Sequence, residues 1–164
     1  MKTRNLVLTA LFIALSFVGS NVKISGTIAF DSLPAFLGAL LLGPVFGAFI
    51  GFLGHLFSAL LTGFPFGLPT HIVIAFGMAV TMLGFGHSYR LLKGKLPLII
   101  VLIITGIVGV ILNGPFSLAL CAPLIGPATA IAMAPVLILG SAANIVIAIL
   151  LFKGYEYGMQ RRKG

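Results

Sequence analysis

The sequence predicts an all-α integral membrane protein, folded as one compact bundle of six transmembrane helices. Of the 164 residues, 60% are hydrophobic and only 7% are charged, whereas about a quarter of a typical soluble domain is charged. Two stretches of 58 and 57 residues, 32–89 and 96–152, contain no Asp, Glu, Lys or Arg. Each is far longer than the roughly 20 apolar residues that a helix needs to cross a bilayer. Each stretch is therefore expected to fold back on itself within a single domain, residues 1–164.

Breaks in the apolar stretches divide the chain into segments. Three Gly-Pro pairs begin at Gly43, Gly114 and Gly126. Such pairs mark breaks, because glycine allows unusual backbone angles and proline disfavours continuation of a helix. The resulting apolar segments are residues 6–20, 32–61, 70–89, 96–112 and 134–152. The connections 62–69 and 114–130 are expected to be loops that face outward.

Basic residues indicate how often the chain crosses. Residues 1–4 contain two Lys or Arg, 90–95 contain three and 153–163 contain four, and such an excess is typical of cytoplasmic segments. An even number of crossings must then separate the first group from the second, so 32–61 is expected to cross twice. Six spans with both termini cytoplasmic leave only Lys23 of the ten basic residues outside. The alternative is four spans with a re-entrant pair at 32–61.

The motifs that are missing exclude several classes of function. The sequence contains no G-x-x-x-x-G-K-[ST] loop for nucleotide phosphates, no G-x-S-x-G and no H-E-x-x-H. Its three histidines are far apart, and the single Cys121 allows no disulfide or cysteine-cluster metal site. The basic residues lie at the ends and in one loop, which does not suit a nucleic-acid partner. We therefore expect neither an enzyme nor a protein with a metal or cofactor.

Small residues recur at helical spacing on three predicted helices. The stripes are Ala10 and Ala14 on the first, Gly47, Gly51, Gly54 and Ser58 on the third, and Gly140, Asn144 and Ala148 on the last. In lipid, helices associate through close packing that such residues permit. We interpret the second and third stripes mainly as internal packing. For the alanine pair, packing inside the bundle and contact with a partner helix are equally plausible from spacing alone.

Polar residues concentrate toward the outer end of the predicted bundle. They are Asn21, Lys23, Asp31, His55, Ser58, Thr62, Thr70, His71, Asn113, Ser117, Ser141 and Asn144. Because buried polar groups are costly without partners, this one-sided distribution indicates a wet or ligand-filled cavity that opens outward. Phenylalanines 30, 64, 66 and 76 are expected around the same mouth. An apolar wall with a few polar groups is typical of small-molecule sites.

From this distribution we predict the substrate-binding residues. They are Asp31, His55, Ser58, Phe66, His71, Asn113 and Asn144. Three of them have a simpler interpretation. Asp31 could cap the following helix or pair with Lys23, Asn113 could mark the end of a helix, and His71 could lie at the membrane interface.

The arrangement resembles a known family. A short, six-helix chain with its N-terminus inside and an alanine pair on its first helix resembles the substrate-binding S components of energy-coupling factor (ECF) transporters. The stretch DSLPAFLGALLLGPVFGAFIGFLG, residues 31–54, looks like the second and third helices of that family. The resemblance implies a prokaryotic cell membrane, a transmembrane coupling protein that contacts Ala10 and Ala14, and two ATPase subunits. It implies capture of a vitamin-like molecule from outside.

Within that family, one region is similar to the branch assigned to alpha-ribazole, a cobalamin precursor. It comprises GHLFSA at 54–59, GFPFG at 63–67, and His71. Pantothenate, a thiamine precursor and cobalamin itself remain alternatives. Two other classes remain as well. An intramembrane enzyme would use His55 as base and Ser58 as nucleophile but lacks an orienting acid and a strained nucleophile turn, and a ligand-free assembly subunit would use the small stripes for packing.

Overall fold

The structure is a computed structural model that describes residues 3–21, 23–24 and 28–162. Apart from two paired strands of two residues each, its regular elements are helical. The elements are α1 (Thr3–Gly19), β1 (Lys23–Ile24), β2 (Ile28–Ala29), α2 (Leu33–Leu41), α3 (Pro44–Leu61), α4 (Leu68–Leu92), α5 (Leu98–Ile111), a π-helical turn η1 (Leu112–Phe116), α6 (Ser117–Ile125) and α7 (Pro127–Arg161). The predicted all-helical architecture is confirmed.

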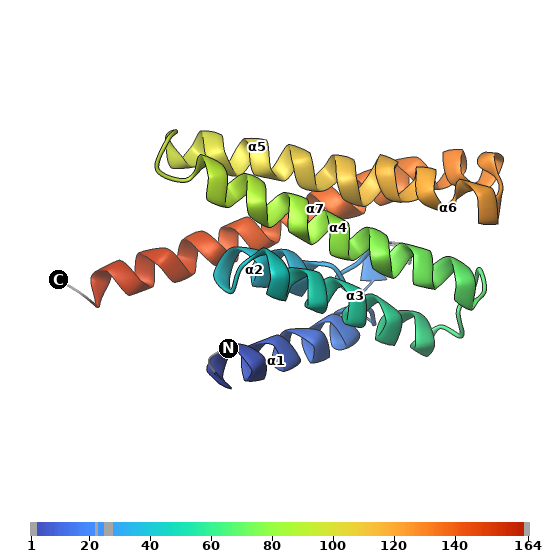
Figure 1. Ribbon diagram of the computed structural model, residues 1–164, viewed down its shortest axis with the longest axis horizontal. Helices are drawn as coiled ribbons and strands as arrows, with labels where there is room; N and C mark the ends of the chain where they lie inside the picture. Colours follow the sequence, from blue (N-terminus) through green and yellow to red (C-terminus); the bar gives the residue numbers. More distant parts are fainter. Residues whose placement is uncertain (1–2, 22, 25–27, 163–164) are drawn as a thin grey trace.

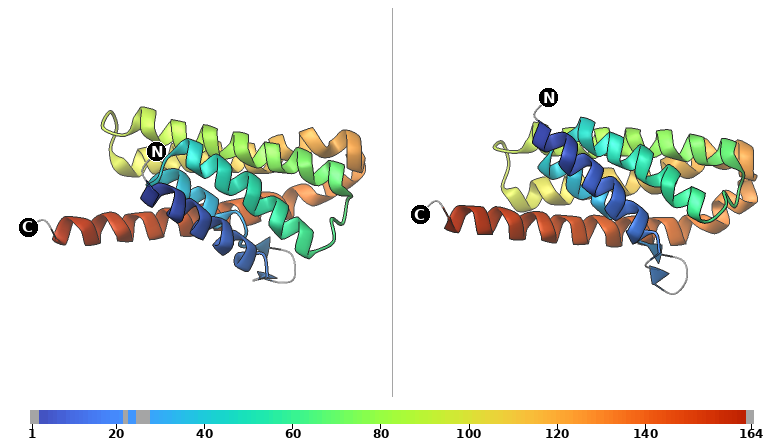
Figure 2. Two further views of the ribbon diagram at one scale, coloured as in Figure 1. Left: turned by 60° about the horizontal axis from the view of Figure 1, so that its bottom comes forward. Right: turned by 90° about the horizontal axis from the view of Figure 1, so that it is seen from below.

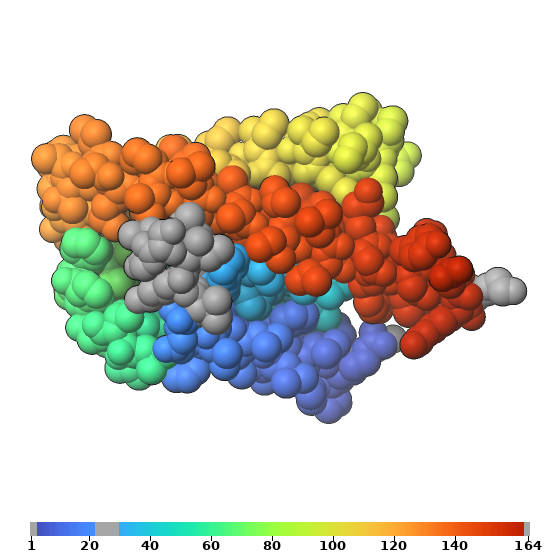
Figure 3. Space-filling model, turned by 180° about the vertical axis from the view of Figure 1, so that it is seen from behind, coloured from blue at the N-terminus to red at the C-terminus, as the bar shows by residue number. Residues whose placement is uncertain are grey.

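The helices run side by side along the long axis of the molecule (Figure 1). The two termini and the loop between α4 and α5 lie toward one end, and the α3–α4 and α6–α7 connections lie at the other. The C-terminal part of α7 extends past the bundle at the first end (Figure 2). Seen from behind, α7 crosses the whole face, with α1 along its lower edge (Figure 3).

The short helix α2 forms the centre of the bundle. Its side chains Ala35, Phe36 and Ala39 are at most 1% exposed, and α2 contacts α1, α3, α4 and α7. The ring of Phe36 meets that of Phe85 edge to face, with centroids 4.9 Å apart. Nine residues rise about 13.5 Å at 1.5 Å per residue, which is less than half of a hydrocarbon core of about 30 Å.

Length and composition single out four helical stretches within the described residues that could each cross a membrane. They are Pro44–Leu61, Leu68–Leu92, Leu98–Ile125 and Pro127–Arg161. The helix α1 is also apolar but has 17 residues. The chain is thus a helical membrane protein with four helical stretches that are long and apolar enough to span a membrane. Because α2 is too short to cross alone, the predicted six spans depend on how α1 and α2 sit in the bilayer.

Two of the three Gly-Pro breaks are confirmed. Gly43, between α2 and α3, has φ +112°, and Gly126, between α6 and α7, has φ +85°. These backbone angles favour glycine, and in each pair the proline opens the next helix, where its fixed φ suits the first turn.

The third break, at Gly114-Pro115, is wrong, and so is the predicted loop 114–130. The helix continues from α5 through η1 into α6 and ends only at Ile125. Proline lacks an N–H, but a wider π-helical turn accommodates it, and the Ser117 hydroxyl donates a hydrogen bond to the Leu112 carbonyl (3.0 Å).

The small-residue stripe of α3 packs inside the bundle, as predicted. A Cβ atom on Gly47 would lie 2.5 Å from Cβ of Ala39 on α2, and one on Gly54 would lie 2.7 Å from Cβ of Ser16 on α1. A Cβ atom on Gly51 would lie 3.1 Å from Cγ of Met82 on α4. The stripe therefore allows α3 to approach three neighbouring helices closely.

Candidate functional site

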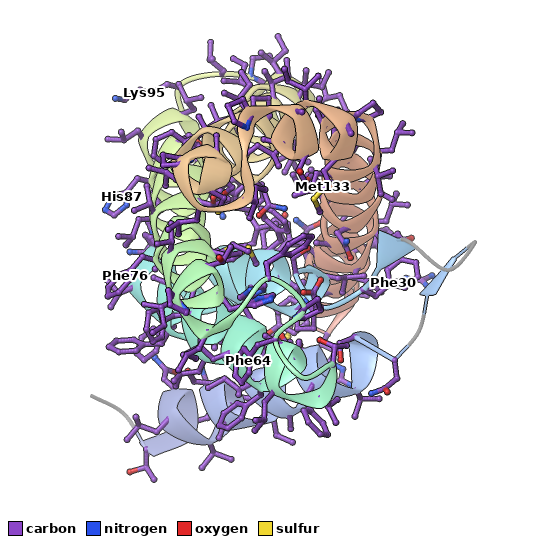
Figure 4. The ribbon with its side chains drawn as sticks, turned by 90° about the vertical axis from the view of Figure 1, so that its right-hand side faces the viewer. Phe30, Phe64, Phe76, His87, Lys95 and Met133 are labelled. Atoms are coloured by element: carbon purple, nitrogen blue, oxygen red, sulfur yellow. The ribbon has the colours of Figure 1, made fainter. Side chains whose placement is uncertain are left out.

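A cavity with about 140 Å³ of space inside it lies at the end of the bundle that carries the α3–α4 and α6–α7 connections. Figure 4 looks into this end and shows Met133 directed into the space that the helices surround. The wall consists of Asp31, Ser32, His55, Phe66, Thr70, Ile74, Met78, Asn113, Ser117, Leu118, Cys121, Ile125, Met133 and Leu137. This mixture of apolar and polar side chains is typical of small-molecule sites.

Three helices supply most of the wall in rows of residues four apart. The row on α4 is Thr70, Ile74 and Met78, that on η1 and α6 is Asn113, Ser117, Cys121 and Ile125, and that on α7 is Met133 and Leu137. Residues at this spacing lie on one face of a helix. The second row exists only because the helix continues through Pro115.

Asp31, His55 and His71 form a connected polar array. The carboxylate Oδ2 of Asp31 lies 3.9 Å from Nδ1 of His55, and these side chains are 25% and 13% exposed. Nε2 of His55 lies 3.1 Å from Nδ1 of His71, with the two rings stacked at 5.3 Å. His71 does not line the cavity but lies behind His55, where the ring of Phe64 covers it edge-on at 5.6 Å. Within residues 3–21, 23–24 and 28–162, the buried Nε2 of His71 has no hydrogen-bond partner.

The amide of Asn113 is the second fixed polar group. Its Nδ2 donates a hydrogen bond to the hydroxyl of Ser141 on α7 (2.7 Å), and both residues are buried. This bond holds the amide in one orientation at the cavity wall. Because the helix continues from α5 through η1 into α6, Asn113 does not end a helix, which was the simpler interpretation of its position.

The structure brings four of the seven predicted binding residues to one wall: Asp31, His55, Phe66 and Asn113. His71 lies one hydrogen bond behind them. The other two are elsewhere. Ser58 lies between α3 and α1 and donates to the Gly54 carbonyl (2.8 Å). Asn144 is 2% exposed on α7, donates to the Gly140 carbonyl (2.9 Å) and is not part of the wall.

The expected ring of phenylalanines at the mouth is largely wrong. Of those four residues, as far as the described wall shows, only Phe66 lines the cavity. Phe76 points away from the bundle (Figure 4) and packs against Phe52, with ring centroids 5.0 Å apart. Phe76 follows His71 by five residues, so the two side chains face in different directions on α4.

Several wall residues were not expected from the sequence. They are Ser32, Ile74, Met78, Leu118, Cys121, Ile125, Met133 and Leu137. A signal for some of them was present, because Met78 follows Thr70 at two turns and Cys121 follows Asn113 at two turns. The second relationship was hidden by the expectation of a loop after residue 113.

A separate surface lies on α1. Ala10 and Ala14 are exposed, as are the apolar side chains Leu11 and Leu15 beside them. The polar Ser16 of the same helix is instead fully buried against α3. A helix on the surface of a soluble protein exposes polar side chains and buries apolar ones, and α1 does the opposite. Its exposed face is apolar and carries two small side chains that are free of intramolecular packing.

A model of a protein family described as ECF transporter, substrate-specific component, matches residues 4–156. The match includes α1, the cavity and most of α7. No curated protein and no solved structure matches the chain.

Proposed function

We propose that this chain, which belongs to the family of ECF transporter substrate-specific components, captures a vitamin-like small molecule in the cavity beside Asp31, His55 and Asn113. A separate transmembrane coupling protein and two ATPase subunits would then supply the energy for import. The family is one of transporter components and not of enzymes. The observation that carries the proposal is a cavity with fixed polar groups at one end of an otherwise apolar bundle.

We place the cavity mouth on the outside of a prokaryotic cell membrane, with six spans and both termini in the cytoplasm. The basic residues of the α4–α5 connection and of the C-terminal part of α7 are at the end opposite to the cavity. Because Lys and Arg are enriched on the cytoplasmic side, this distribution supports an outward mouth. In this arrangement the short helix α2, which is buried against four other helices, is one of the six spans.

Alpha-ribazole is our first choice of substrate. Its flat benzimidazole ring suits the apolar wall residues, which include Phe66, Met78 and Met133. Its ribose hydroxyls suit the polar wall residues Asp31, His55 and Asn113. Pantothenate and a thiamine precursor are comparable in size to alpha-ribazole, whereas cobalamin with its corrin ring is much larger than alpha-ribazole.

Ala10 and Ala14 are our proposed contacts with the coupling protein. Both are exposed on a helix that lies at the edge of the bundle. Small side chains one turn apart let the backbone of a partner helix approach closely. The rest of the exposed face of α1 is apolar and would pack against that partner in the membrane.

Mass spectrometry of the purified chain, followed by titration calorimetry with alpha-ribazole in detergent, tests the proposal. His55→Ala and Asn113→Ala should each weaken binding by roughly ten- to a hundredfold, since losing a hydrogen bond to a buried group costs about 1–3 kcal/mol. Ser58→Ala is the matched control, because Ser58 is buried but outside the wall. Unchanged affinity in both wall variants would remove them from the site. Binding of pantothenate with no response to alpha-ribazole would keep the function and overturn the substrate.

A further inference from the structure

An open groove lies between α5 and α7, separate from the candidate substrate cavity. Its lining residues fall within 99–111 of α5 and 142–149 of α7, and all of them are apolar. The groove contains about 400 Å³ of space. The two helices contact each other and lie side by side on the face shown in Figure 3. Among the described residues, none lines both the groove and the substrate cavity.

Gly106 leaves space in this groove because it has no side chain. A Cβ atom there would lie 3.6 Å from Cγ2 of Ile145 and 3.9 Å from Cδ1 of Ile149, which is ordinary van der Waals contact. On the two sides of the groove, Ile103 of α5 and Val146 of α7 are 55% and 54% exposed. The groove is therefore open on a face of the bundle that meets the hydrocarbon of the membrane.

The length of the groove matches one leaflet of a bilayer. It begins in the first turn of α5 and reaches Ile111, the last residue of that helix. Over these residues the helix rises about 18 Å at 1.5 Å per residue, and half of a hydrocarbon core is about 15 Å thick. A membrane-spanning helix, from a partner or a second copy, would need a groove of about twice this length. The groove therefore fits the acyl chain of a phospholipid.

A basic side chain lies where the groove reaches the membrane surface. Lys153 follows the lining residues Ala142, Val146 and Ile149 at spacings of four, three and four, so all four share one face of α7. The helices α5 and α7 run in opposite directions (Figure 1). Because Ile149 is in reach of Gly106, Lys153, one turn further along α7, is level with the first turn of α5. Lys153 is exposed and, among the described side chains, forms no ion pair.

We propose that this groove binds an anionic phospholipid, with one acyl chain along the apolar lining and the phosphate at Lys153. In the orientation proposed above, the lipid belongs to the cytoplasmic leaflet, where anionic lipids attract basic residues next to the membrane. The lipid would fill the space that Gly106 leaves between α5 and α7. This site is independent of the substrate cavity, so its test does not depend on the choice of substrate.

Native mass spectrometry of the full chain in detergent tests the charge preference. The chain would be titrated with phosphatidylglycerol and, separately, with phosphatidylcholine that has the same acyl chains. The first phosphatidylglycerol should bind roughly fivefold more tightly, the effect of one basic residue beside an anionic lipid. Lys153→Gln should remove this preference. Lys95→Gln is the matched control, because it removes the same charge at the same end from a side chain that points away from the bundle (Figure 4). No preference in the wild type, or equal losses in both variants, would overturn the proposal.

Filling the groove tests the place of the acyl chain. Gly106→Phe should weaken binding of the first phosphatidylglycerol by roughly tenfold, since overfilling a fitted apolar space is costly. Ala142→Phe fills the same groove from α7 and gives a second test if the first variant does not fold. Leu139→Phe is the control, because Leu139 is 63% exposed on α7 outside the groove. Unchanged lipid binding in the groove variants would overturn the proposal. So would a dimer of the wild-type chain that these variants disperse, because a second copy would then occupy the groove.

Discussion

Nε2 of His55 on α3 lies 3.1 Å from Nδ1 of His71 on α4. Only His55 reaches the cavity wall, and His71 is buried behind it. His71 would therefore affect a ligand through the orientation and tautomer of His55, as a positioning residue.

The first prediction concerns this contact. His71→Phe keeps a ring of similar size but removes the nitrogen that shares a hydrogen bond with His55, so binding should weaken by roughly three- to tenfold, the equivalent of a hydrogen bond worth about 0.5–1.5 kcal/mol. His71→Asn should recover most of the loss, because the amide group of Asn can donate or accept a hydrogen bond from nearly the same place as Nδ1. Titration calorimetry with alpha-ribazole measures both variants, and thermal melting checks that they are folded. An Asn variant that binds no better than the Phe variant would show that His71 contributes only its bulk.

The sequence predicted the helical membrane fold because 60% hydrophobic residues and two long uncharged stretches leave no other solution. It also predicted the turns at Gly43 and Gly126, where the backbone angles favour glycine. It failed at Gly114-Pro115, because the local rule that proline ends a helix does not include a π-helical turn and a serine hydroxyl that accommodate it. That single error hid one of the three rows of the cavity wall.

The candidate site was predicted in part for a similar reason. The positions of Asp31, His55 and Asn113 in the sequence placed them near one end of the bundle. Position along the bundle axis does not tell, however, which way a side chain faces. Ser58 and Asn144 are at suitable depths, yet each is directed into helix packing and donates to a carbonyl of its own helix. Periodicity could not distinguish these faces, because in a helix that is apolar all round the few polar residues can face either a cavity or a neighbouring helix.

The second prediction concerns the turn between α2 and α3. Gly43 has φ +112° and ψ +169°, a region almost restricted to glycine, and the guanidinium of Arg90 occupies the place of its missing Cβ. Gly43→Ala should lower stability by about 1–3 kcal/mol, the usual range for such backbone strain, together with displacement of Arg90. Gly94→Ala is the matched control, since Gly94 also has positive φ (+83°) but nothing lies within 4 Å of its Cβ position. Thermal melting in detergent should show the larger loss for Gly43→Ala, and equal losses would argue against a contribution from Arg90.

The third prediction concerns orientation in the membrane. In a Cys121→Ser background, Thr62→Cys should react with an impermeant maleimide on intact cells, and Lys95→Cys should react only after lysis. Both residues are exposed and lie at opposite ends of the bundle. Lys95 is a better site for the introduced cysteine than Gly94, because the positive φ of Gly94 disfavours a side chain. Reaction of Lys95→Cys in intact cells would contradict six spans with cytoplasmic termini.

The last prediction concerns the exposed face of α1. Ala10→Trp and Ala14→Trp should abolish uptake in cells that contain the coupling module, because a bulky ring keeps a partner helix from close approach. Binding by the isolated chain should stay within about threefold of wild type, since neither residue lines the cavity and effects at distant sites are usually independent. Leu139→Trp is the matched control: it adds the same ring on α7, where the side chain is 63% exposed, and it should import normally. Co-purification of the coupling protein distinguishes the possible causes of lost uptake. If the alanine variants still co-purify with the coupling protein and import at the wild-type rate, α1 is not the docking face, and the small residues on its surface have some other role.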